Sequence, residues 1–232
     1  MAGCAAREIK QKIPVITEQQ YKKFTWQEKA TYFEGITEGK TQIPAKEIYN
    51  AALRETVPSV VIAAIGSISK GWLAEYRETL YTLLKYKNPV VRWKACKKIT
   101  EIPIEGDLPY LVALFSDKDW MVRECAFSQV RLYLSEREEK VYFFTIIASL
   151  NERNIQVIKE IYQTLKWYND ERTFTFMYKR MFHVASPQEL IVIMRELAEY
   201  KNAMVKQRIW YFAKHHPDSL VREEATRLLG TM

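Results

Sequence analysis

The 232-residue sequence is poor in the residues that make tight turns, cross-links and membrane spans. It has only seven glycines and eight prolines, too few for the many turns of a β-sandwich. Its three cysteines show neither a disulfide framework nor metal-ligand spacing, which fits a reducing cytosol. The longest apolar run, residues 57–65, is far shorter than a membrane span. We therefore expect a cytoplasmic, helical protein that makes no contact with membranes.

Recognisable catalytic chemistry is also missing. The only histidines are His183, His215 and His216, and adjacent histidines point to different sides of a helix, so they are not expected to bind a metal together. The sequence contains no glycine-rich phosphate loop, Ser/His/Asp arrangement or HExxH run. It therefore predicts no metal site and no cofactor, and it favours a protein without catalytic activity.

What the sequence has instead is a helix-start signal that recurs along most of its length. The signal stands at Pro58, Pro89, Asp119, Asn154, Pro187 and Asp218, at intervals from 30 residues (119−89) to 35 residues (154−119). An amphipathic stretch precedes each of these positions and another follows it. Two helices joined by a tight turn cannot bury both of their apolar faces alone, so copies of the pair must stack on one another. The sequence therefore predicts an all-α repeat protein.

Apolar residues at three- and four-residue spacing mark the expected buried face of each second helix. One such stripe consists of Val91, Ala95, Ile99 and Ile102; that of the last helix consists of Leu220, Val221, Ala225, Leu228 and Leu229. Cys96 and Cys125 stand beside alanines in these patterns, where we expect them to be small apolar fillers.

Three segments resemble the second-helix signature of HEAT repeats: Val91-Arg92-x-x-Ala95, Val122-Arg123-x-x-Ala126 and Val221-Arg222-x-x-Ala225. The resemblance covers about residues 40 to 229, judged by the repeat period, and departs from the pattern at Ile158, which replaces the arginine. It implies a right-handed α-solenoid of about six HEAT-like helical hairpins. The whole chain, 1–232, would form one domain, with 1–40 as a degenerate first unit or N-terminal cap and 41–232 as the repeats.

The repeated arginine of HEAT-like arrays commonly bonds an acidic turn residue of its own or the adjacent unit. The resemblance therefore implies that Arg123 bonds Asp117 and that Arg222 bonds the nearby Asp218. Arg92 has no acidic residue near it in the sequence. We expect Arg92 to be the arginine that is available to a partner.

The positive charge is concentrated in one repeat. The net charge is +7, and the segment 80–100 contains several basic residues and no acidic one. Helical spacing places Trp93, Lys94 and Lys97 away from the apolar stripe, with Trp93 and Lys97 side by side. The residues predicted to bind a partner are Arg92, Trp93, Lys94, Lys97 and Lys98. The alternative interpretation is a solvated basic face whose Trp93 packs on the next repeat.

The sequence favours a non-catalytic scaffold that binds a protein with an acidic surface through the concave face of its second helices. Nucleic-acid binding is the alternative. HEAT-like alkylpurine DNA glycosylases place a tryptophan and an aspartate four residues apart, with an arginine one repeat later. Trp120, Glu124 and Lys159 resemble this set, although Glu and Lys replace the Asp and Arg, and Gln207 stands where a second tryptophan would be. This resemblance implies DNA alkylation repair; a regulatory subunit of a larger enzyme is a third alternative.

Overall fold

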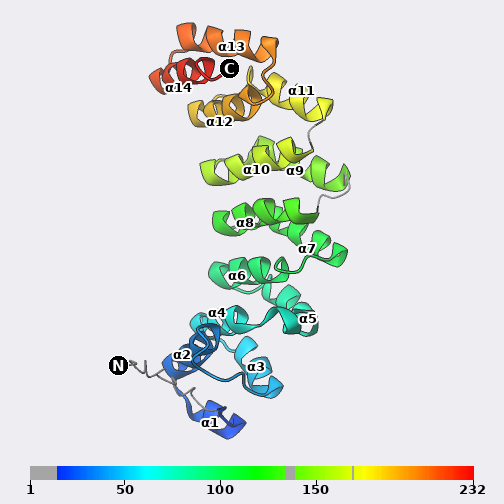
Figure 1. The fold of residues 1–232 in the computed structure, drawn as a ribbon, viewed down its shortest axis with the longest axis vertical. Coiled ribbons are helices and arrows are strands. Elements are labelled where there is room, and N and C mark those ends of the chain that lie inside the picture. The colour runs from blue at the N-terminus through cyan, green and yellow to red at the C-terminus, as the bar shows by residue number, and fades with distance from the viewer. Residues whose placement is uncertain (1–14, 134–138, 169) are drawn as a thin grey trace, which may run out of the picture. The chain divides into compact units, whose positions relative to one another are not determined.

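The computed structural model describes residues 15–133, 139–168 and 170–232. Over these ranges the chain forms fourteen α-helices and four short 3-10 helices and contains no strand (Figure 1). The prediction of an all-α protein is therefore confirmed for them. None of the helices in the described ranges has the length and apolar character needed to cross a membrane.

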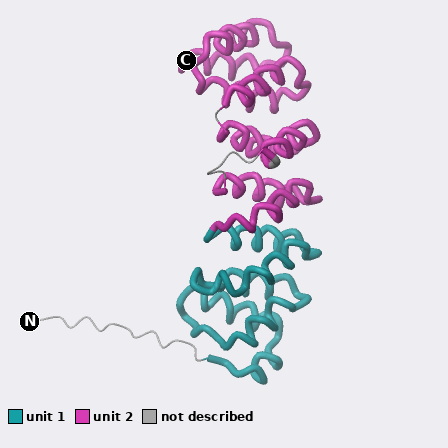
Figure 2. The backbone as a smooth tube through the Cα atoms, turned by 90° about the vertical axis from the view of Figure 1, so that its right-hand side faces the viewer, with its two compact units in different colours: residues 1–102 teal, residues 103–232 magenta. Residues whose placement is uncertain are grey.

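Contacts between residues group the chain into two compact units, 1–102 and 103–232 (Figure 2). The first unit contains three successive helix pairs: α1 (Glu18–Lys23) and α2 (Trp26–Thr37), α3 (Lys46–Leu53) and α4 (Pro58–Ser67), α5 (Leu73–Leu83) and α6 (Pro89–Ile99), with the 3-10 helix η1 (Lys70–Trp72) before α5. The second helix of each pair packs on the next, α2 on α4 and α4 on α6. The segment expected to be a degenerate first unit thus contains a helix pair, while its residues 1–14 lie outside the described part of the chain.

The second unit contains four successive helix pairs. They are α7 (Leu108–Ala113) and α8 (Trp120–Val130), α9 (Glu139–Asn151) and α10 (Ile155–Trp167), α11 (Glu171–Arg180) and α12 (Pro187–Ala198), and α13 (Ala203–His215) and α14 (Ser219–Leu229). The 3-10 helices η2 (Glu105–Asp107), η3 (Leu114–Ser116) and η4 (Arg131–Tyr133) flank α7 and α8. The second helices α8, α10, α12 and α14 pack in chain order, which is the neighbour-to-neighbour packing of a repeat array.

Short polar side chains begin most of the second helices. The capping residues are Asn88, Asp119, Asn154, Ser186 and Asp218, and each side chain accepts a hydrogen bond from a backbone N–H two or three residues further on. These bonds satisfy N–H groups that have no partner within the helix. Helix α4 has no such side-chain cap and begins with Pro58, whose missing N–H costs little at this position.

The expected apolar stripes form the cores of the two units. Val91, Ala95 and Ile99 are fully buried, as are Cys96 and Cys125, neither of which is in a disulfide. Two residues of the expected stripes are exposed instead, Ile102 and Leu220. Helix α6 ends at Ile99, so Ile102 no longer follows the helical spacing. Leu220 precedes the buried Val221, and neighbouring residues of a helix point about 100° apart.

Candidate partner-binding surface

The arginine of each Val-Arg-x-x-Ala signature binds the turn that precedes its own helix. In all three, Nη1 donates hydrogen bonds of 2.7 to 3.0 Å to backbone carbonyl oxygens five or six residues earlier. The acceptors are Tyr86 and Lys87 for Arg92, Asp117 for Arg123, and His216 and Pro217 for Arg222. The repeated arginine therefore fixes the turn between the two helices of its pair.

The expectation that Arg92 is available to a partner is wrong. Its side chain bonds two turn carbonyls, and the residue is only 4% exposed. The missing acidic neighbour does not leave the guanidinium unpaired, because carbonyl oxygens are also good acceptors for its N–H groups. Arg92 is a structural residue of the first unit.

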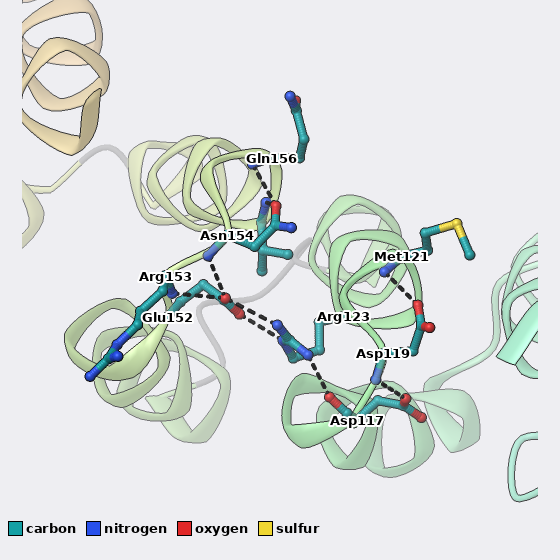
Figure 3. Close-up of polar contacts among 9 residues, drawn as sticks. Asp117, Asp119, Met121, Arg123, Glu152, Arg153, Asn154 and Gln156 are labelled. Atoms are coloured by element: carbon teal, nitrogen blue, oxygen red, sulfur yellow. Dashed lines mark hydrogen bonds and ion pairs between the residues drawn. The ribbon is translucent and has the colours of Figure 1, made fainter. Parts of the chain in front are cut away.

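The carboxylate that Arg123 binds is Glu152, which the sequence did not indicate (Figure 3). Nε of Arg123 lies 2.6 Å from Oε2 of Glu152, and Nη2 lies 3.0 Å from Oε1. This is the two-pronged geometry in which arginine and carboxylate bind most strongly. The Asp117 carboxylate instead accepts the backbone N–H of Asp119 at 2.8 Å. The acidic partner of Arg123 thus comes from the turn between α9 and α10 and not from the turn before its own helix.

Likewise, the Asp218 carboxylate is not bonded to Arg222. The Asp218 side chain accepts the N–H groups of Leu220 and Val221, while Arg222 bonds the carbonyls of the turn. Asp218 is therefore used as the helix cap.

The Arg123–Glu152 pair predicts a loss of stability in acid. Burial alone raises the pKa of the Glu152 carboxyl, but hydrogen bonds from Arg123 and from the backbone N–H groups of Asn154 and Arg153 bring it below its ordinary value. A carboxyl whose pKa is lower in the folded state stabilises the fold above its unfolded pKa, and this contribution disappears as the pH falls through the folded pKa. We expect urea unfolding below about pH 4.5 to show a smaller pH dependence in Glu152→Gln than in the wild type. Equal slopes would contradict the assignment.

Lys98 is also structural. The residue is 6% exposed, and its Nζ donates to the carbonyl oxygen of Ile68 at 3.0 Å and lies 2.8 Å from Oε1 of Glu101. A cation at this position hydrogen-bonds carbonyl groups at the C-terminal end of α4 and is attracted by the negative end of the helix dipole there. The prediction that Lys98 contacts a partner is not supported by this geometry.

The remaining three predicted residues form a small, partly exposed group on α6. The ammonium of Lys97 lies 4.6 Å from the centre of the Trp93 ring, so the expected side-by-side arrangement is confirmed. Lys97 is exposed, and Trp93 and Lys94 are half-buried. We call Trp93, Lys94 and Lys97 the α6 basic group.

A groove of about 620 Å³ lies at the C-terminal ends of α2 and α4, and Lys94 of the α6 basic group lies next to its lining residue Gly66. It is lined by Val15, Ile36, Thr37, Gly39, Thr41, Gln42, Ile43, Gly66, Ser67, Ile68 and Ser69. None of these residues is charged. A Cβ atom at Gly66 would lie 3.5 Å from Cε of Lys94 and 3.9 Å from Oγ1 of Thr37. Gly66 lies on α4, between Thr37 of α2 and Lys94 of α6. Because Gly66 has no side chain, Lys94 can reach the edge of the groove.

The residues of the glycosylase resemblance lie on two neighbouring second helices of the second unit. Trp120 is the first residue of α8 and is 42% exposed, while Glu124, one turn later, is half-buried. Lys159 is half-buried on α10, which packs on α8. Their catalytic role stays a prediction. No protein-family model matches this chain, and no curated protein matches it either.

Proposed function

We propose that this chain is a non-catalytic helical-repeat scaffold, a right-handed α-solenoid of about six HEAT-like hairpins, which binds an acidic protein segment through its second helices. The sequential packing of α2 on α4 and of α4 on α6 supports the repeat architecture. A stacked array forms its surface during folding, so binding costs little ordering of the scaffold itself.

The observation that carries the proposal is the uncharged groove beside the α6 basic group. Lys94 supplies positive charge at the edge of the groove, and Lys97 adds a second charge one turn of α6 away. Among the described residues neither lysine forms an ion pair with a carboxylate. A groove of this size accommodates one or two apolar side chains. The site therefore fits an acidic segment that carries a large apolar residue, with its carboxylates on the lysines and the apolar side chain in the groove.

Selection from a displayed library of random 16-residue peptides tests this proposal. We expect the wild-type protein to enrich acidic peptides that contain a large apolar residue. The variant Trp93→Ala, Lys94→Glu, Lys97→Glu should bind the enriched peptides at least about tenfold more weakly, because a buried aromatic anchor and two attractive charges are lost together. Fluorescence anisotropy with labelled peptides measures the change.

The matched control is Lys85→Glu, Lys87→Glu. Both lysines are exposed in the turn between α5 and α6, and the control changes the net charge by the same amount as the test variant. Affinity should change less than threefold in this control. Equal weakening of both variants would mean that total charge, not the groove, attracts the peptides, and it would refute the proposed site.

A further inference from the structure

A continuous strip of aromatic rings runs along α11 and onto α13 in the second unit. It consists of Phe174, Tyr178 and Phe182 from the α11 segment and Arg208, Tyr211 and His215 from α13. Phe174 and Tyr178 are four positions apart on α11, and Phe182 follows two residues after the end of that helix. The α13 residues are three and four positions apart, so the residues within each helix lie on one face. We call these six residues the aromatic strip.

The rings of the strip contact one another in series, one pair stacked, one pair edge to face and one pair tilted. The rings of Phe174 and Tyr178 are parallel within 7° with centres 5.9 Å apart, and those of Tyr178 and Phe182 are 5.4 Å apart. On α13, the ring centres of Tyr211 and His215 are 4.8 Å apart. The two sets therefore form aromatic rows on both sides of Arg208.

Arg208 joins the two rows. Its guanidinium carbon lies 4.1 Å from the ring centre of Phe182, 5.0 Å from that of Tyr211 and 4.5 Å from that of Phe212. Its Nε is buried without a hydrogen-bond partner, and among the described residues no carboxylate pairs with this guanidinium. A planar cation held between rings, with no acidic partner, can still donate to an anion that approaches from the solvent.

The strip is exposed at Phe182, Tyr211 and His215 and half-buried at Phe174, Tyr178 and Arg208, and its surroundings are positively charged. Phe182 and Tyr211 are 46% and 47% exposed, and the neighbouring Trp210 is 51% exposed. No Asp or Glu occurs in 172–188 or 200–217, and the exposed Lys179 and Lys214 lie in these segments. The acidic Glu171 stands one turn before Phe174, at one end of the strip. Arg180 does not add to the surface charge, because it is paired with Glu189.

We infer that the aromatic strip is a binding site for single-stranded nucleic acid. Exposed rings offer flat faces on which unpaired bases stack, and adjacent cations contact the phosphates between the bases. Duplex DNA fits this surface less well, because the faces of its bases are covered by their neighbours. An acidic polypeptide would satisfy the cations but leave the rings without stacking partners. The site lies on first helices of the second unit, so it is independent of the groove in the first unit.

Fluorescence anisotropy with a fluorescein-labelled oligothymidylate of 12 nucleotides tests the inference. The wild-type affinity should fall linearly with salt on a double logarithmic plot, as expected when phosphates are neutralised. Tyr211→Ala should weaken binding about tenfold with an unchanged salt slope, because one stacking contact is lost. Arg208→Ala should weaken binding by a similar factor and also reduce the slope by about one phosphate contact.

Two controls separate the site from general charge. Lys206→Ala removes an exposed cation from the opposite side of α13, and Phe143→Ala removes an exposed ring from α9; both should bind within twofold of the wild type. Far-ultraviolet circular dichroism checks that every variant keeps its helix content. Failure of the wild type to bind the oligonucleotide at 50 mM salt would overturn the inference. So would unchanged affinity in Tyr211→Ala and Arg208→Ala, or equally tight binding of poly-L-glutamate.

Discussion

Replacement of Arg123 by alanine is expected to lower the free energy of unfolding of the second unit by about 3 kcal/mol. The guanidinium ties together two turns, since it bonds the carbonyl oxygen of Asp117 and both carboxylate oxygens of Glu152. The Glu152 side chain is 9% exposed. Its carboxylate would therefore keep its desolvation cost and lose its strongest partner. Urea unfolding followed by circular dichroism at pH 7 measures the loss.

Arg222→Ala is the matched control, because Arg222 has the same place in its signature and bonds two turn carbonyls. Among the described residues it pairs with no carboxylate, so we expect its removal to cost only about 1 kcal/mol. Arg123→Lys should recover part of the loss, since an ammonium keeps the charge but not the two-pronged geometry. If Arg222→Ala were as damaging as Arg123→Ala, the carbonyl bonds alone would explain the effect.

The helix starts could be predicted from the sequence because capping is local chemistry. Asn88 and Asp218 bond N–H groups two and three residues further on, so the cap and its partners lie within one short stretch of sequence. The apolar stripes are equally local, since Val91, Ala95 and Ile99 follow the helical period and are buried. The fold class and the order of the helix pairs follow from these two signals.

The partners of the charged residues could not be predicted in the same way. Glu152 is 29 residues from Arg123, and one acceptor of Lys98, besides the nearby Glu101, is the backbone carbonyl of Ile68, 30 residues away. A carbonyl oxygen is present at every residue and leaves no mark in the sequence. For this reason the sequence does not reveal that two of the five predicted partner-binding residues, Arg92 and Lys98, are structural. Trp93 and Lys97 do form the predicted pair.

The aromatic strip is only partly visible in the sequence. The four-residue spacing of Phe174, Tyr178 and Phe182 is visible in the sequence, and so is the absence of acidic residues around Arg208. The sequence does not show that the α11 segment contacts α13. This contact places the Arg208 guanidinium carbon 4.1 Å from the centre of the Phe182 ring. That contact depends on how the successive helix pairs pack, and packing turns two separate patterns into one surface.

Replacement of Glu189 by leucine is the second change that we expect to be severely destabilising, by about 3–4 kcal/mol. Oε1 of Glu189 accepts the Tyr162 hydroxyl at 2.8 Å and Nε of Arg180 at 3.0 Å. Tyr162 is fully buried and Glu189 nearly so. Burial, followed by the nearby Glu189 charge, raises the pKa of Tyr162, so the phenol remains a donor at all ordinary pH values. Leucine at position 189 would leave this donor and the Arg180 cation without their acceptor.

A double-mutant cycle with Tyr162→Phe separates these contributions. Tyr162→Phe alone should cost only about 1 kcal/mol, because Glu189 keeps its bond to Arg180. In the Glu189→Leu background the same change should restore stability, since no buried hydroxyl is then left without an acceptor. Urea unfolding of the four proteins gives the coupling energy, which should exceed about 1 kcal/mol. Additive losses would show that Tyr162 and Glu189 act separately and that the damage in Glu189→Leu comes from Arg180 alone.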